Sequence, residues 1–163
     1  MSYVLNEYLP HQKYFEDISR IPHGSHNEKK LSDYLVKFAN DLGLEVKQDN
    51  LYNVIIYKPA SKGYENHPAI ILQSHIDMVC EKNGDCNFDF EKDSLQLYIE
   101  DGFVRAKGTT LGADDGAGAA LTMAILADKT LKHPALECVF TVCEEVGLIG
   151  AQALDKKDFT SKR

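Results

Sequence analysis

Two apolar segments of this chain end abruptly in ionisable side chains. The run HPAIILQSHID (67–77) and the run HPALECVFTVCEE (133–145) both begin with His-Pro-Ala and close on histidine or acids. Unbroken apolar stretches of this length are typical of strands inside a sheet. We therefore expect a central strand over 69–72, covered on both faces, and a second buried strand that ends just before Glu144.

The rest of the chain alternates predicted helices with predicted strands. Three helices are expected. The first covers 12–21, the second runs from a capping box of Ser25 and Glu28 to Gly43, and the third covers 115–127. Alternating stretches indicate two strands in 44–59 and a hairpin in 95–108 that turns at Asp101–Gly102; a polar loop is expected over 81–93. This order predicts a single α/β sandwich with a right-handed crossover through 115–127.

Charge and cysteine usage exclude several classes of protein. The net charge is −7 and no run of Lys or Arg exceeds two residues, which argues against a nucleic-acid or membrane partner. The apolar run 117–127 is far shorter than the roughly 20 residues that span a bilayer. The N-terminus MSYVLNEYLP does not resemble a signal peptide, and the four cysteines contain no C-x-x-C pair. We expect reduced thiols and a cytoplasmic location.

Three ionisable motifs are expected to meet at one edge of the sheet. Sites in open α/β sheets form beyond the carboxyl ends of strands, and the turn GADDG (112–116) leads into a helix beside them. The motifs contribute one imidazole and five carboxylates: His75, Asp77, Asp114, Asp115, Glu144 and Glu145. No Lys or Arg lies in any of the motifs, so one or two divalent cations would have to balance the charge.

The mixture of donors restricts the metal and suggests roles. Imidazole plus carboxylate, without thiolate, suits zinc, manganese or cobalt better than calcium or magnesium. His75 would bind metal, and Asp77 would accept a hydrogen bond from its other ring nitrogen. One of Glu144 and Glu145 would bind metal while the other deprotonates a water whose pKa the metal lowers from about 16 towards 7. Spacing does not decide which glutamate does which.

The sequence argues against two other kinds of ligand site. A phosphate loop is excluded, because the glycine-rich segment 108–118 contains neither G-x-G-x-x-G nor G-K-[ST], and its paired aspartates would repel phosphate. Oxygen-bearing side chains at alternate positions suggest a calcium loop: Asp85, Asn87, Asp89 and Glu91. Phe90, however, stands where that loop requires glycine. We therefore expect 81–93 to be a solvated loop.

Three ordered motifs resemble a known family. LQSHIDMVCEKN, GTTLGADDGAGAA and TVCEEVGLIGA together are similar to the co-catalytic zinc peptidases that include carboxypeptidase G, peptidase T and the aminoacylases. The sequences of these motifs are most similar to those of the aminoacyl-histidine dipeptidase branch. The resemblance implies a three-layer α/β/α sandwich with a mixed central sheet. It also implies two zinc ions, with manganese or cobalt as possible substitutes, and hydrolysis of Xaa-His dipeptides by a metal-bridging hydroxide.

The resemblance also implies a role for each matching residue. His75 would be a terminal ligand of one metal, Asp114 would bridge two, and Glu145 would bind the second. Asp77 would orient His75, and Glu144 would be the general base. A cis peptide bond between Asp114 and Asp115 is implied as well.

The family's pattern extends beyond the motifs of this chain. It takes a further acid after the glutamate pair, a histidine near its far C-terminus and a lid domain, whereas no histidine follows His133 here. We therefore expect 1–163 to be the N-terminal part of a catalytic domain, inactive alone, without the lid and C-terminal parts. Its exposed sheet would favour a homodimer or other self-association. The alternatives are a related deacylase or tripeptidase, or a truncated remnant without activity.

Overall fold

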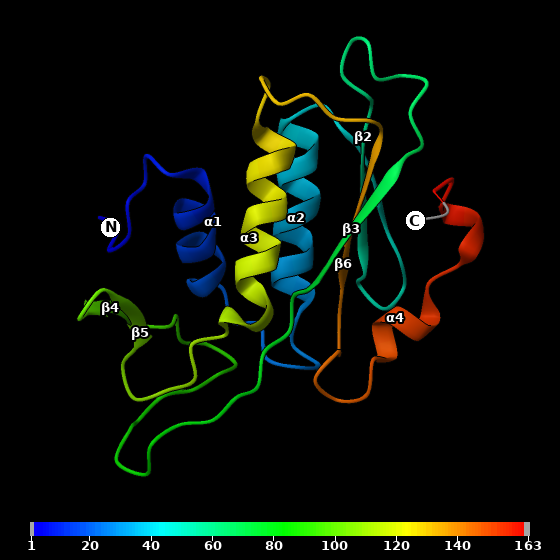
Figure 1. Cartoon of the computed structure of the whole chain (residues 1–163). Coiled ribbons are helices and arrows are strands. Elements are labelled where there is room, and N and C mark those ends of the chain that lie inside the picture. Colours follow the sequence, from blue (N-terminus) through cyan, green and yellow to red (C-terminus); the bar gives the residue numbers. More distant parts are fainter. Residues whose placement is uncertain (1, 162–163) are drawn as a thin grey trace.

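Four strands form a mixed sheet at the centre of the molecule (Figure 1). The computed structural model describes residues 2–161. The strands are β1 (Glu45–Gln48), β2 (Val54–Lys58), β3 (Ile70–His75) and β6 (Leu136–Thr141), in the order β1-β2-β6-β3. β1 pairs with β2 and β2 with β6 in antiparallel fashion, whereas β3 and β6 are parallel. This confirms the predicted α/β class with a mixed sheet.

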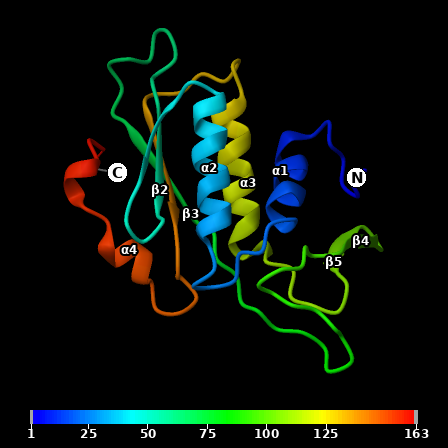
Figure 2. The same cartoon turned by 180° about the vertical axis from the view of Figure 1, so that it is seen from behind.

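Helices lie on both sides of this sheet, as Figures 1 and 2 show from opposite directions. On one side are α1 (Pro10–Ser19), α2 (Lys29–Asp41) and α3 (Ala113–Ala127). On the other side are the short α4 (Ile149–Ala153) and the 3-10 turn η1 (Lys156–Asp158). α3 lies between the parallel strands β3 and β6 in sequence, as the predicted crossover requires.

The alternation of side chains along the strands decides what each face packs against. Val54, Ile56 and Phe140 are completely buried and belong to the main core, which also contains Leu35 of α2 and Met123 of α3. Residues at intervening positions face α4 and η1: the Tyr57 hydroxyl donates to the carbonyl of Asp158 (3.0 Å). The two faces of β2 therefore carry different layers, which is how a strand period of two builds a three-layer fold.

The prediction of a central strand over 69–72 is wrong for the described part of the chain. Within residues 2–161, β3 pairs with β6 alone and forms one edge of the sheet. Leu72 packs against the core, but Ile70 is 42% exposed. An apolar run shows that a strand can be buried. It does not show whether that strand lies at the centre or at the edge of the sheet.

The predicted capping box of Ser25 and Glu28 is also wrong. α2 begins at Lys29, and Glu28 makes no side-chain capping hydrogen bond. The Ser25 hydroxyl donates to Asp77, and the Glu28 carboxylate accepts from the backbone of Cys143. Both side chains therefore bind buried partners in distant segments and not the backbone at the start of their own helix. The predicted end of the helix is confirmed, because Gly43 follows it with a φ of 69°.

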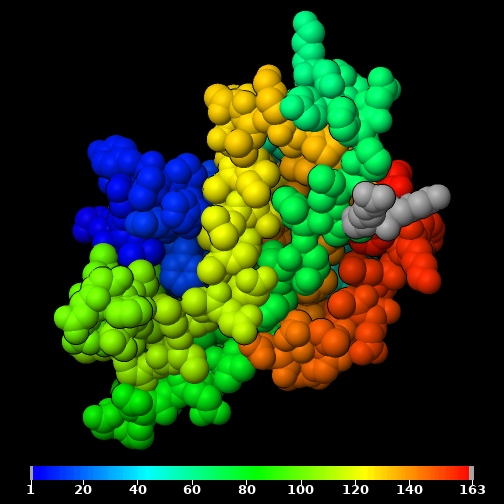
Figure 3. All heavy atoms as spheres, in the orientation of Figure 1, coloured from blue at the N-terminus to red at the C-terminus, as the bar shows by residue number. Residues whose placement is uncertain are grey.

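The second half of the chain contains a separate hairpin. β4 (Leu97–Glu100) and β5 (Phe103–Ala106) pair around Asp101 and Gly102, whose φ values of 52° and 80° are the left-handed conformation that a two-residue turn requires. Figure 3 shows the hairpin region (yellow-green) against the N-terminal segment (blue). The irregular segment before it confirms the predicted loop over 81–93. All four cysteines are unpaired, and no helix within 2–161 is long and apolar enough to cross a membrane.

Candidate metal centre

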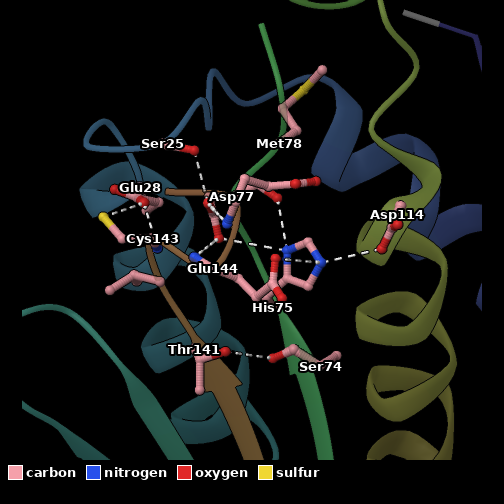
Figure 4. A network of polar contacts seen from close by, with 12 residues as sticks. Ser25, Glu28, Ser74, His75, Asp77, Met78, Asp114, Thr141, Cys143 and Glu144 are labelled. Atoms are coloured by element: carbon pink, nitrogen blue, oxygen red, sulfur yellow. Dashed lines mark hydrogen bonds and ion pairs between the residues drawn. The ribbon is translucent and has the colours of Figure 1, made fainter. Parts of the chain in front are cut away.

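The ends of β3 and β6 and the start of α3 bring the three ionisable motifs together (Figure 4). His75 lies opposite Thr141 in the parallel register, so the segments that follow both strands leave the sheet side by side. One nitrogen of His75 and one carboxylate oxygen each of Glu144 and Glu145 lie within 4.8 Å of one another. His75 Nε2 is 3.2 Å from Asp114 Oδ1. The structure thus brings His75, Asp114, Glu144 and Glu145 close together.

His75 lies between Asp77 and Asp114, as Figure 4 shows. Its Nδ1 is 3.1 Å from the backbone carbonyl oxygen of Asp77 and 3.5 Å from the Asp77 carboxylate. The backbone carbonyl is therefore the better acceptor for Nδ1–H, which leaves Nε2 facing Asp114. Burial acts to lower the pKa of His75, but the contact with Asp114 and the charges of Asp77 and Glu144 outweigh it and raise the pKa above its ordinary value.

The carboxylate of Asp77 binds the backbone of the glutamate pair. It is 1% exposed. Its Oδ1 accepts from the Glu144 N–H (2.9 Å), and its Oδ2 accepts from the Glu145 N–H (3.2 Å) and the Ser25 hydroxyl (2.8 Å). Asp77 therefore connects the histidine segment to the glutamate segment, a function that the sequence motifs did not indicate.

The two consecutive aspartates point in different directions. The Asp114 side chain is 90% exposed and faces His75. The Asp115 carboxylate accepts from the N–H of Gly118 in its own helix (3.0 Å), and burial raises its pKa. The peptide bond between them is cis, as the family resemblance implied. Asp114 rather than Asp115 therefore faces the cluster.

The donor set fits a divalent cation. Within residues 2–161, no Lys or Arg forms an ion pair with any of the five carboxylates of the three motifs. Carboxylates that share a small volume repel one another unless a positive charge lies among them. One imidazole with several carboxylates, and no thiolate, is a typical set for zinc, manganese or cobalt.

Residues 71–162, more than half of the chain, match the family described as Peptidase family M20/M25/M40. The chain belongs to this family.

Relatives in the M20 family agree with this assignment. The chain is 46% identical over 140 residues to the cytosol non-specific dipeptidase of Escherichia coli (strain K12), which is 86% of this chain and 29% of that protein. The crystal structure of aminoacylhistidine dipeptidase from Vibrio alginolyticus superposes with a TM-score of 0.93 and 42% identity over 98% of this chain and 33% of that chain.

A second solved structure extends the comparison to another peptidase. Aminopeptidase PepT from Bacillus cereus ATCC 10987 is 28% identical, with a TM-score of 0.76 over 98% of this chain and 43% of that chain. The chain therefore spans about a third of the length of the first relatives. The resemblance to this family, and to its aminoacyl-histidine dipeptidase branch, is confirmed.

Sequence reasoning missed a second set of residues next to this cluster. The buried carboxylate of Glu28 accepts from the N–H of Cys143 (2.9 Å) and from its thiol (3.1 Å). His26 Nδ1 lies 3.4 Å from the same sulfur. Cys143 directly precedes the glutamate pair. The contacting positions lie more than 110 residues apart, and nothing in the spacing of Ser25 and Glu28 distinguished them from an ordinary helix start.

Proposed function

We propose that the protein carrying this chain hydrolyses dipeptides, with Xaa-His dipeptides as the preferred class, with the help of two zinc ions. The observation that supports this most is the convergence of His75, Asp114, Glu144 and Glu145 without a Lys or Arg counter-ion. The dipeptidase relatives support the substrate class.

The family resemblance suggests a role for each of these side chains, and their clustering is compatible with those roles. His75 and Glu145 would each hold a metal as terminal ligands, and Asp114, whose side chain is 90% exposed, would be the ligand shared between the two metals. When bound, divalent cations of this kind acidify water and polarise a peptide carbonyl. Glu144 takes the proton of the attacking water and transfers it to the leaving amine. Its side chain is 33% exposed and lies 3.9 Å from His75 Nε2, which suits a base that must exchange protons with substrate.

We further propose that a complete site needs residues in addition to those of this chain. A two-metal centre with one bridging carboxylate needs more terminal ligands than His75 and Glu145 supply. The family resemblance implies a further acid, a further histidine and a lid domain. This chain then provides the N-terminal part of the catalytic domain. The relatives, which are about three times as long, support this division.

The exposed surface supports self-association. β3 presents an unpaired edge within the described sheet, and Ile99 and Phe103 of the hairpin are exposed. Strand edges and apolar surface of this kind promote pairing between molecules. We expect dimers or larger species of the 163-residue chain in light scattering at about 10–100 μM. A monomer over that range would contradict this proposal. We also propose a cytoplasmic location and a peptide substrate, with no nucleic-acid or membrane partner.

A single substitution in the full-length protein tests the reaction. Glu144→Gln should lower kcat for a Xaa-His dipeptide by about a hundredfold or more, because it removes the general base. Zinc content, measured by mass spectrometry, should remain. The matched control is Glu91→Gln in the exposed loop. An unchanged kcat for Glu144→Gln would contradict the proposal.

A substrate panel separates the remaining alternatives. Faster cleavage of N-acyl amino acids or of tripeptides than of dipeptides would favour a related deacylase or tripeptidase. Removal of metal with a chelator, followed by zinc, manganese or cobalt, identifies the metal that restores the rate. Failure of all three to bind would favour a remnant without activity.

A further inference from the structure

We propose that residues 24–28 form a positioning segment for the glutamate pair, in which Ser25 acts through Asp77 and Glu28 acts through Cys143. The inference rests on the proposed function, because the orientation of Glu144 and Glu145 matters only if they serve a metal centre. Ser25 and Glu28 have no role as ligand or base in that centre. They are positioning residues.

Three consecutive backbone amides of the glutamate segment bind carboxylates from elsewhere in the chain. The N–H of Cys143 donates to Glu28 (2.9 Å), that of Glu144 to Asp77 (2.9 Å) and that of Glu145 to the other oxygen of Asp77 (3.2 Å). Cys143 has a left-handed φ of 50°. Successive amides next to a left-handed residue converge on one side of the chain and form a nest for anions. The backbone of both glutamates is therefore held from outside their own segment.

The positioning segment is itself attached to the histidine segment. Gly24 forms a parallel bridge with Met78, and the Met78 N–H donates to the carbonyl of His23 (3.2 Å). A Cβ at Gly24 would lie 2.4 Å from the sulfur of Cys80, so a larger residue here would force that side chain to move. Residues 23–25 thus run alongside the chain that leaves β3, and the hydroxyl of Ser25 reaches the Asp77 oxygen that also accepts from Glu145.

The two carboxylates would be poor choices if stability were their only purpose. Glu28 is 4% exposed and Asp77 1% exposed, and within 2–161 neither forms an ion pair with Lys or Arg. Burying an unpaired carboxylate is costly, and apolar side chains of similar size usually fill such space at lower cost. Only an acceptor, however, can orient the amides of 143–145. The observed pairing therefore favours a role in positioning.

The test compares buried residues that hold the glutamate pair with buried residues that do not. Glu28→Ala and Ser25→Ala remove the contacts; Glu28→Gln and Ser25→Thr keep an acceptor and a donor. The matched controls are Glu16→Ala and Ser32→Ala. Glu16 is a buried carboxylate that accepts from the backbone of Val4 and Leu5, and the buried hydroxyl of Ser32 donates to Tyr52.

Two measurements are made on the full-length protein and its variants. Hydrogen exchange of the amides of 143–145, in the presence of a chelator, reports positioning without metal. Zinc affinity, from calorimetric titration, reports its consequence. Glu28→Ala should speed exchange at 143–145 about tenfold, as expected for loss of one hydrogen bond to a charged group. It should also weaken zinc binding about tenfold or more. Ser25→Ala should have a smaller effect of the same kind.

The conservative variants and the controls make the outcome specific. Glu28→Gln and Ser25→Thr should recover most of the wild-type exchange rate and zinc affinity. Glu16→Ala and Ser32→Ala should lower the midpoint of unfolding but leave both the exchange rate at 143–145 and the zinc affinity unchanged. Unchanged exchange at 143–145 in Glu28→Ala and Ser25→Ala, or an equal change in the controls, would overturn the inference. If Glu28→Ala does not fold, the comparison of exchange at 143–145 between Ser25→Ala and Ser32→Ala tests the inference.

The same data separate this inference from the proposed function. If exchange rises in the variants but the wild-type protein binds no zinc, the metal centre is wrong and the positioning of the segment stands. If the wild type binds zinc and the variants leave exchange at 143–145 unchanged, the positioning inference is wrong and the metal centre stands.

Discussion

The two sides of the candidate site are built in opposite ways. On the glutamate side, Asp77 is almost completely buried and both its oxygens accept backbone or hydroxyl hydrogens. On the aspartate side, the carboxylate of Asp114 is largely exposed and faces Nε2 of His75. The first side is ordered by the protein itself. The second presents an exposed carboxylate, which we propose as a metal ligand.

This difference separates stability from ligand binding. Buried carboxylates that hold backbone amides contribute to folding, because their loss leaves several donors without partners. An exposed carboxylate contributes little to folding and can serve binding alone. Equivalent changes on the two sides should therefore affect different measurements.

The largest effect is expected for Asp77→Asn. The amide group cannot accept from Glu144, Glu145 and Ser25 at once, and one of its own donors would face a backbone N–H. We expect a loss of about 3 kcal/mol in the free energy of unfolding, measured by urea denaturation with a chelator present. Asp114→Asn is the matched control and should change it by less than about 0.5 kcal/mol. Equal losses for the two variants would contradict the comparison.

The reverse is expected for metal binding at the exposed side. Asp114→Ala should weaken zinc affinity about tenfold or more, because it removes a proposed ligand, yet leave the metal-free protein as stable as the wild type. Calorimetric titration measures the affinity. Asp85→Ala, in the exposed loop, is the control and should bind zinc like the wild type. A destabilised Asp114→Ala would show that this side also supports the fold.

A smaller effect concerns pH. Burial lowers the pKa of His23, and the carbonyl of Ile21 and the charges of Asp77 and Glu28 only partly oppose this. The unfolded chain therefore takes up a proton on His23 at a pH where the folded chain does not. Stability is fully present above the unfolded pKa of 6.5 and is lost as pH falls below it towards the lowered folded pKa.

The variant His23→Gln tests that pH dependence. It should flatten the decline in unfolding free energy below pH 6.5, with a change of at most about 1.4 kcal/mol per pH unit. Urea denaturation between about pH 7 and pH 5 measures it. Substitution of the exposed His67 by Gln should keep the wild-type slope. A wild-type slope in His23→Gln would assign the pH dependence to other groups.

The parts of the site that depend on local pattern were predictable. An apolar run followed by His75 or Glu144, and a glycine-rich turn before Asp114, indicated strand ends and a helix start, and parallel strands bring their carboxyl ends to one edge. The parts that depend on distant partners were not. Ser25 and Glu28 have the spacing of a helix cap, and only the tertiary fold gives them stronger partners.

Strand order was unpredictable for a related physical reason. The apolar content of 69–72 reports that these side chains tolerate burial, and burial can come from another strand, a helix or another molecule. The main core shows the converse: Val54, Ile56 and Phe140 alternate with residues that face the opposite layer, and that period is visible in the sequence. Local periodicity predicts which side chains of a strand face the core, whereas long-range pairing decides which strands are neighbours in the sheet.

The bond between Glu28 and Cys143 joins positions 115 residues apart, and this has a consequence for folding kinetics. A nascent chain exposes Glu28 to water until the far end of β6 has emerged and docked. Contacts of such long sequence separation form late, because the intervening loop must close first. Loss of a late contact leaves the refolding rate nearly unchanged and accelerates unfolding. The residues that order the glutamates would therefore also set the lifetime of the native state.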